Sequence, residues 1–229
     1  MIEAPMVLRR MAFLLVVVAP LCAASAQGAV TGQVSLKERD GEQTEDLTNV
    51  IVWLEPVAAA RRLVPTTATI ELKARQFTPR VRAVAVGSKI EFPNQDSFSH
   101  NVFSKAPNGA FDTGVYARGR SHDQTFKEAG VFPVYCNIHP RMTGYVVVLD
   151  TPYFATASDD GRFSVAGVPA GSYVLHVWHD RAPESTQRVA VSAAGTPVGR
   201  LELDARGYRF VPHRNKFGQE YSNAAGDRY

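Results

Sequence analysis

The segment YCNIHPRMTGYVVV, residues 135–148, places a thiol, an imidazole and a thioether in one short loop. These side chains are Cys136, His139 and Met142, at the spacing C-x-x-H-x-x-M. The runs VFPVY before the loop and GYVVVL after it are short and rich in valine and aromatic residues, which is typical of strands. We therefore expect two rigid strands to hold the loop, with its three side chains close together.

The composition of the whole chain is that of a globular protein. Of 229 residues, 45% are hydrophobic and 21% are charged, which excludes a collagen-like or wholly disordered chain. The formal net charge is +3 and the charges are scattered rather than gathered in runs, so no nucleic-acid partner is expected. Two cysteines are too few for a disulfide-rich scaffold.

One of the two cysteines, Cys22, falls in a segment with the features of a secretory signal. Two arginines precede an apolar run from Met11 to Leu21, and Ala24-Ser25-Ala26 provides the small residues that a cleavage site needs. The run is shorter than the ~20 apolar residues of a membrane span. We therefore predict that residues 1–26 are removed on export to the periplasm, without later membrane association. Cys136 is then the single thiol of the mature chain.

Short alternating or β-branched runs, separated by Gly, Pro, Asn and Asp, recur along the mature chain. This pattern is typical of β-sandwiches and predicts an all-β fold. From Gly207 on, the sequence is polar and without pattern, and residues 206–229 are predicted to be a tail. The predicted strands are Gly32–Leu36, Val50–Leu54, Thr69–Lys73, Val81–Val86, Lys89–Phe92, Asn101–Ser104, Ser121–Phe126, Gly130–Tyr135, Gly144–Leu149, Gly161–Val165, Ser172–Trp178, Arg188–Ala190 and Arg200–Leu203.

A second imidazole, His100, lies upstream at the start of another predicted strand. Two His, one Cys and a weakly bound Met form the ligand set of type 1 (blue) copper sites, which transfer electrons. The thiolate is soft, imidazole suits both oxidation states of copper, and the thioether tunes the potential. Zinc is the chemical alternative, but it favours tetrahedra of thiolate or harder ligands. Ordinary packing is the alternative for each residue taken alone.

The segment around this motif resembles the amicyanin and plastocyanin-like cupredoxins. YCNIHPRMTGYVVV is similar to their ligand loop, DQTFKEAGVFPVYC to the strand before the Cys, and ARQFTPRVRAVAVGSKIEFPNQDSFSHNVFS to the strands and first-ligand segment upstream. The resemblance covers roughly residues 66–150 and implies a Greek-key β-sandwich. It also implies one type 1 copper ion, bound by His100, Cys136, His139 and axial Met142.

The same resemblance implies roles for neighbouring residues. Asn101 would hydrogen-bond near Asn137 and so brace the two ligand loops. His139 would present its ring edge near the surface as the exit for the electron, with Pro140 in the surrounding apolar patch. Arg141 would bias the choice of partner. A solvated loop charge is the alternative for Arg141.

A second resemblance concerns TASDDGRFSVAGVPAGSYVLHV, residues 156–177, which looks like the later half of a carboxypeptidase-regulatory-like domain. That domain is a small β-sandwich related to transthyretin-like and carbohydrate-binding-like folds. The run from Gly32 to Leu54 has the shape of its earlier half. We therefore expect the cupredoxin unit to be inserted between the first strands of this sandwich, 27–57, and its remainder, 151–205. Sequential order of the domains is the plainer alternative.

These observations predict a periplasmic copper protein that carries one electron and is not an enzyme. Proteins with this pairing resemble those called methylamine utilization proteins, which implies an amine dehydrogenase as donor and a c-type cytochrome as acceptor. We expect a monomer. The first alternative is a module that binds glycan or protein and uses the cupredoxin unit as a scaffold or copper store. The second is a copper chaperone.

Overall fold

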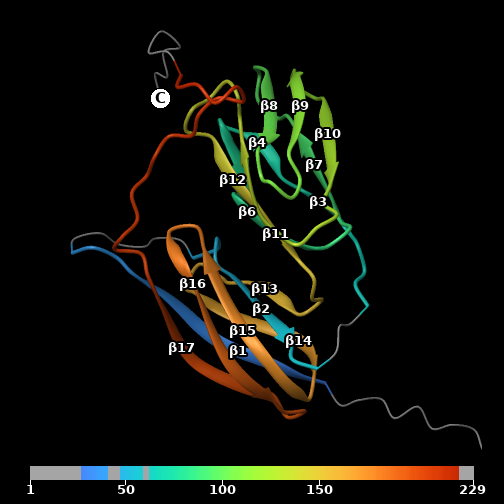
Figure 1. Ribbon diagram of the computed structural model, residues 1–229, viewed down its shortest axis with the longest axis vertical. Helices are drawn as coiled ribbons and strands as arrows, with labels where there is room; N and C mark the ends of the chain where they lie inside the picture. The colour runs from blue at the N-terminus through green and yellow to red at the C-terminus, as the bar shows by residue number, and fades with distance from the viewer. Residues whose placement is uncertain (1–26, 41–46, 59–61, 222–229) are drawn as a thin grey trace, which may run out of the picture.

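The computed structural model describes residues 27–40, 47–58 and 62–221 (Figure 1). These residues form strands, turns and loops, and none of them belongs to a helix that could cross a membrane. The predicted all-β fold class is thereby confirmed. The predicted signal peptide, residues 1–26, lies outside the described residues.

Figure 1 shows the strands arranged as two sandwiches, one above the other. In chain order the strands are β1 (Gln27–Lys37), β2 (Ile51–Pro56), β3 (Thr67–Thr69), β4 (Glu71–Lys73), β5 (Gln76–Thr78), β6 (Val81–Ala85), β7 (Lys89–Pro93), β8 (His100–Ser104), β9 (Phe111–Tyr116), β10 (Ser121–Thr125), β11 (Gly130–Tyr135), β12 (Thr143–Leu149), β13 (Phe154–Thr156), β14 (Arg162–Pro169), β15 (Gly171–His179), β16 (Ala182–Val191) and β17 (Thr196–Asp204).

The lower sandwich combines strands from both ends of the described chain. One sheet has the order β14-β1-β17 and the other the order β13-β2-β15-β16. Strand β1 is antiparallel to β14 and parallel to β17, and β2 lies antiparallel between β13 and β15. Alternate apolar residues of these strands fill the space between the sheets, where Val30, Leu54 and Leu175 are fully buried.

The upper sandwich consists of β3 to β12. Its five-stranded sheet has the order β6-β12-β11-β8-β9, and the second sheet has the order β10-β7-β3, with the β4-β5 hairpin beside β7. Phe92, Phe126 and Phe132 are among the large side chains of its core, and the rings of Phe126 and Phe132 meet edge to face with centroids 5.0 Å apart. Cys136 and Met142 belong to the same buried cluster.

Apolar side chains of both sandwiches bury one another where the sandwiches meet. Ile51 and Trp178 of the lower sandwich pack with Val81, Val147 and Leu149 of the upper one. Because such burial removes apolar surface from water, it stabilises the contact at roughly 25 cal/mol per Å². A small third hydrophobic cluster therefore lies between the two sandwiches.

An ion pair reinforces this contact. The guanidinium of Arg80, which precedes β6, donates through both terminal nitrogens to Asp180, which follows β15, and the Nη1–Oδ1 distance is 2.9 Å. The side chain of Asp180 is fully buried. Arg80 also lies over the ring of Tyr145 on β12, and Tyr145 meets Trp178 edge to face. Charged and apolar contacts thus join the two sandwiches.

The start of β12 is fixed by a close approach of backbone to backbone. A Cβ on Gly144 would lie 2.9 Å from the carbonyl oxygen of Arg80 and 3.0 Å from Cβ of Phe77, so only glycine fits there. The next residue, Tyr145, donates its N–H to Arg80 O at 2.8 Å and begins the parallel pairing with β6. This arrangement sets where the loop between β11 and β12 ends.

Strands β5, β9 and β13 do not correspond to predicted strands, and β3 shares only Thr69 with the predicted strand Thr69–Lys73. Three of them have only three residues each, which is too short for a periodic signal. In β9, Gly114 has a φ of 69° and the pairing with β8 shifts register, which interrupts the alternation. This strand carries Asp112, which accepts a hydrogen bond from Asn101 beside His100.

Candidate metal centre

Three candidate ligands come from neighbouring strands of the five-stranded sheet. His100 is the first residue of β8, and Cys136 directly follows β11. These antiparallel strands pair at Phe103 and Tyr135, so the start of β8 and the end of β11 lie at the same end of the sheet. His139 lies in the loop from β11 to β12. The topology thus brings together residues that are 36 positions apart in the chain.

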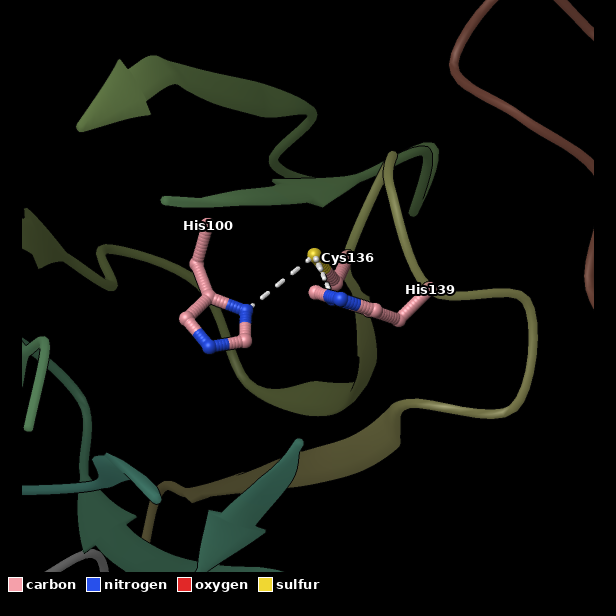
Figure 2. Close-up of side chains that lie close together, drawn as sticks. All are labelled: His100, Cys136 and His139. Atoms are coloured by element: carbon pink, nitrogen blue, oxygen red, sulfur yellow. Dashed lines mark hydrogen bonds between the residues drawn. The ribbon is translucent and has the colours of Figure 1, made fainter. Parts of the chain in front are cut away.

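The donor atoms of these residues converge (Figure 2). The Sγ of Cys136 lies 3.6 Å from Nδ1 of His100 and 3.5 Å from Nδ1 of His139, and the three donor atoms lie within 4.8 Å of one another. Cys136 and His100 are fully buried, and His139 is 8% exposed. These closely spaced donor atoms are therefore largely shielded from water.

This donor set fits a copper ion. A metal bound at about 2.0 Å to imidazole nitrogen and about 2.3 Å to thiolate sulfur, with an angle of about 120°, separates the two donors by about 3.7 Å. The observed separations of 3.6 and 3.5 Å are close to that value. One soft thiolate with two imidazoles is the trigonal set of copper electron-transfer sites.

Met142, the predicted axial ligand, closes the same loop. It is 1% exposed, and both its backbone N–H and its carbonyl oxygen form hydrogen bonds within the loop. The N–H of Met142 donates to the carbonyl oxygen of His139 at 3.0 Å, and the N–H of Cys136 donates to that of Met142 at 3.2 Å. These bonds fold the loop back on itself and bring Met142 beside Cys136. The axial role of its thioether stays a prediction.

Asp96 orients His100, a role that no motif in the sequence indicated. Its Oδ2 lies 2.8 Å from Nε2 of His100, so the Nε2–H donates to the carboxylate and Nδ1 is left to face Cys136. Burial lowers the pKa of His100, although Asp96 acts in the opposite direction. The imidazole is therefore held in the neutral form that metals require. An acidic residue four positions before a candidate His ligand is the signal that could have found Asp96.

Two backbone N–H groups hold the Asp96 carboxylate in turn. Ala74 donates to Oδ1 at 2.7 Å and Arg75 to Oδ2 at 3.0 Å. Both residues lie in the left-handed region, with φ of 53° and 58°, which is uncommon for residues other than glycine. Burial raises the pKa of Asp96, but the hydrogen bonds from Arg75, His100 and Ala74 outweigh it and the pKa is lowered. The turn between β4 and β5 thus presents two successive donors to one carboxylate.

The predicted brace between Asn101 and Asn137 takes a different route. The side-chain amide of Asn101 donates to Oδ1 of Asp112 at 2.6 Å and to the carbonyl oxygen of Gly114 at 2.9 Å. Oδ1 of Asn137 accepts from the backbone N–H of Lys216 at 2.8 Å. The sequence did not indicate this route because neither β9 nor a role for residues beyond 206 was predicted.

The predicted exit patch surrounds His139. The ring of His139 lies 5.5 Å from that of Phe98, and Phe98 and Ile138 are 37% and 38% exposed. Pro140 is half-buried and Arg141 is exposed, as expected for the rim of such a patch. Its use in electron exchange stays a prediction.

Comparisons with known families agree with this centre. The family model described as copper binding proteins, plastocyanin/azurin family, matches residues 65–149. The model described as polysaccharide lyase family 4, domain II, matches residues 148–198. The curated amicyanin of Paracoccus versutus is 34% identical over 99 residues, which is 41% of this chain and 73% of that relative.

Solved structures similar to this chain include three copper proteins. The purple cupredoxin from Nitrosopumilus maritimus is 26% identical, covers 36% of this chain and 99% of its own, and has a TM-score of 0.33. A reduced amicyanin variant is 26% identical, with 36% and 82% covered and a TM-score of 0.35. The copper-containing nitrite reductase from Thermus scotoductus is 29% identical, with 42% and 25% covered and a TM-score of 0.35.

A buried Cys flanked by two His at one end of a β-sandwich defines the blue copper class of protein. Within that class, the chain belongs to the plastocyanin/azurin family of copper-binding proteins, with an amicyanin as a relative. Copper is therefore its cofactor, as predicted. A second β domain is also shown, and its likeness to carboxypeptidase-regulatory-like domains stays a prediction.

Proposed function

We propose that this protein is a one-electron carrier and not an enzyme, with one copper ion held by His100, Cys136, His139 and, axially, Met142. The observation that carries the proposal is the convergence of two Nδ1 atoms on the buried Sγ of Cys136, at 3.6 and 3.5 Å. Copper, when bound, supplies the change between Cu(II) and Cu(I). The residues around it supply a fixed geometry.

That geometry is held from several directions. Asp96 fixes the ring of His100 at Nε2, and two backbone bonds fix the loop that carries His139 and Met142. Cys136 is anchored at the end of β11, inside the apolar core. Ligands held in this way move little when the charge of the site changes, and a small reorganisation cost is what fast electron transfer needs.

The route for the electron is proposed to pass through His139. Of the four proposed ligands it has the largest exposure, 8%, while the others are exposed by 1% or less. Phe98 and Ile138 place apolar surface beside it, which favours close docking of a partner. Arg141 adds a positive charge at the rim, which favours a partner with a complementary negative patch.

We also propose the setting and the division of the chain. Removal of residues 1–26 would deliver the protein to the periplasm as a monomer, with an amine dehydrogenase as donor and a c-type cytochrome as acceptor. A cupredoxin unit of residues 66–150 would interrupt a second sandwich formed by 27–57 and 151–205. The sheet orders support this division, because β1 and β2 pair with β13 and later strands whereas β3 to β12 pair with one another.

Electron exchange tests the carrier function. Stopped-flow mixing of the reduced, copper-loaded protein with an oxidised c-type cytochrome should give rapid transfer, and Ile138→Asp should slow it at least ~10-fold by placing a charge in the apolar patch. Val57→Asp, a matched change at an exposed residue of the lower sandwich, should leave the rate unchanged. Slow exchange by the wild type, together with ready release of copper to an acceptor, would favour the copper store or chaperone.

The axial role of Met142 has its own test. Met142→Gln replaces a thioether with an amide oxygen, a harder ligand that favours Cu(II) over Cu(I). The variant should keep its thiolate-to-copper absorption band and show a lower reduction potential in voltammetry. A potential equal to that of the wild type would remove Met142 from the ligand set.

A further inference from the structure

We propose that the C-terminal segment, residues 208–221, is a working part of the metal centre: it clamps the ligand loop, residues 136–142, and ties that loop to the strand that bears His100. The inference rests on the proposed function and adds positioning residues to it. Figure 1 shows the chain leaving β17 in the lower sandwich and running along the upper sandwich to its far end. From composition alone, this part of the chain is expected to be only a polar tail.

The segment bonds to the ligand loop at three positions. The hydroxyl of Tyr221 donates to the carbonyl oxygen of Cys136 at 3.0 Å. Oδ1 of Asn137 accepts from the N–H of Lys216, and Nε2 of His213 lies 3.3 Å from the carbonyl oxygen of His139. Cys136 and His139 also take part in the backbone bonds that the loop makes to Met142. The contacts of the segment therefore restrain the backbone at or beside two of the proposed copper ligands.

The second part of the clamp reaches the other ligand-bearing strand. Nζ of Lys216 donates to Oδ2 of Asp112 at 2.7 Å, and Oδ1 of Asp112 accepts from the amide of Asn101 at 2.6 Å. Asn101 directly follows His100. Lys216 thus connects Asn137, next to Cys136, with Asn101, next to His100, through one carboxylate. This chain of bonds braces the two ligand loops, the role that was expected of Asn101 through hydrogen bonding near Asn137.

Aromatic packing anchors the segment on the rigid sheet. The ring of His213 stacks on Tyr135 of β11 at a centroid distance of 4.6 Å and meets Phe103 of β8 edge to face at 6.1 Å. Tyr221 meets His213 edge to face at 5.4 Å. Tyr135 and Phe103 are paired across the sheet, so the segment rests on the two strands from whose ends Cys136 and His100 extend. In one further contact, the guanidinium of Arg141 lies over the ring of Phe210, at the rim of the patch around His139.

The physical consequence is preorganisation of the metal-free site. Each hydrogen bond of the clamp opposes opening of the loop, so loss of the clamp would let the ligand loop open far more often. The thiol of Cys136 would then meet solvent more frequently, and the loop would give up copper more readily. A segment that only covers the surface would protect neither the thiol nor the bound metal in this residue-specific way.

The experiment compares the wild type with a chain that ends at Gly207 and with two point variants, Tyr221→Phe and Lys216→Met. The first readout is the rate of alkylation of Cys136 in the metal-free, folded protein. The second is the rate at which the copper-loaded protein yields Cu(I) to a chelator. Val211→Ser, a change on the same segment at a side chain that is 77% exposed, is the matched control.

We expect the truncated chain to react at least ~10-fold faster in both measurements. Tyr221→Phe and Lys216→Met should give intermediate increases, Lys216→Arg should restore the wild-type rates because it keeps the positive charge near Asp112, and Val211→Ser should change nothing. Wild-type rates in Tyr221→Phe and Lys216→Met would overturn the inference, even if the truncated chain fails to fold. If the wild type takes up no copper, the proposed function fails, while the alkylation rates still decide whether the segment clamps the loop.

Discussion

We expect the carboxylate of Asp96 to affect both the copper affinity and the reduction potential of the centre. It accepts from Nε2 of His100 and is itself held by two backbone N–H groups, so it fixes the ring and places a negative charge beside the metal site. Asp96→Asn keeps the shape and removes the charge. Copper affinity should fall ~10-fold or more, and the reduction potential should rise because a negative charge that stabilises Cu(II) is lost. Competition with a chelator and voltammetry measure the two effects.

Asp123→Asn is the control for this change, because Asp123 is an exposed carboxylate on β10 of the same sandwich. It should leave both quantities unchanged. An affinity for copper in Asp96→Asn equal to that of the wild type would show that the carboxylate does not position His100.

His179 makes the fold sensitive to acid. It is 2% exposed and its Nδ1 accepts from the N–H of Arg181 at 3.1 Å, so the fold needs the neutral ring. Burial lowers its pKa below the ordinary value of 6.5; Asp180 and Glu38 act in the opposite direction, and Arg181 and Arg80 in the same one. The unfolded chain therefore binds the proton more tightly than the folded one, and stability falls as the pH drops below about 6.5.

Urea unfolding of the metal-free protein between pH 7.5 and pH 5.5 measures this effect. The wild type should lose more free energy of unfolding over this range than His179→Gln, which has no titrating group there. The comparison is needed because burial also lowers the pKa of His100 and His213, which act in the same direction in both proteins. Equal losses in the two proteins would contradict the assignment to His179.

The proposed ligands could be read from single residues of the sequence, whereas the residues that support them could not. Cys136, His139 and Met142 were proposed from their spacing within a single loop, and His100 from its place at the start of a predicted strand. Asp96 acts through a side-chain orientation that depends on the turn at Ala74 and Arg75, and that turn uses two non-glycine residues with positive φ. No sequence rule predicts such a turn, because the left-handed region is normally reserved for glycine.

Among the turns that join the strands, the turn before β14 depends on Gly161. Its φ is 79°, and a Cβ would lie 2.1 Å from the carbonyl oxygen of Val34 on β1. Gly161→Ala should lower the free energy of unfolding by the ~1–2 kcal/mol of backbone strain and by roughly 1–3 kcal/mol more from overpacking. Chemical denaturation measures the sum.

Gly199→Ala separates the two contributions. Gly199 has nearly the same φ, 73°, but no atom lies within 4 Å of the position that a Cβ would take there. This variant should show only the backbone strain. If both variants lost the same stability, the close approach of Gly161 to β1 would not be a constraint on the lower sandwich.

Most strands could be predicted because valine-rich or alternating runs stand between turn residues. The alternation fails in β9, where Gly114 has a positive φ and the pairing with β8 shifts register. Because β9 was not predicted, the place of Asp112 beside Asn101 could not be predicted either. Pairing partners could not be read from periodicity. That β1 lies between β14 and β17 follows from contacts across the whole chain, and only the resemblance to a divided sandwich suggested such an arrangement.

The two sandwiches of the molecule are joined by the ion pair between Arg80 and Asp180. Asp180 is fully buried, so removing its partner leaves an unpaired charge in the contact. Arg80→Met should cost ~3 kcal/mol in the free energy of unfolding, and the double variant with Asp180→Asn should cost less than the sum of the single changes. Thermal unfolding should show one transition, because both sandwiches share the cluster around Trp178. Two transitions, of which only one responds to Arg80→Met, would show that the sandwiches unfold independently.

The course of the C-terminal segment could not be predicted from its composition. Its sequence is polar, and its contacts go one at a time to backbone carbonyls, an asparagine and an aspartate rather than to an apolar core. Contacts of this kind produce no periodic hydrophobic pattern in the sequence. Only the folded chain shows that residues near its end lie on the ligand loop.

Titration of the metal-free mature protein with Cu(II), followed by visible absorption and by electron paramagnetic resonance, tests the copper centre itself. We expect an intense thiolate-to-copper band that saturates at one copper per chain, with a narrow copper hyperfine splitting. Both signals should be absent in Cys136→Ser. A wild-type protein without the band, or a Cys136→Ser variant with the same spectrum, would contradict the assignment of a blue copper centre to His100, Cys136 and His139.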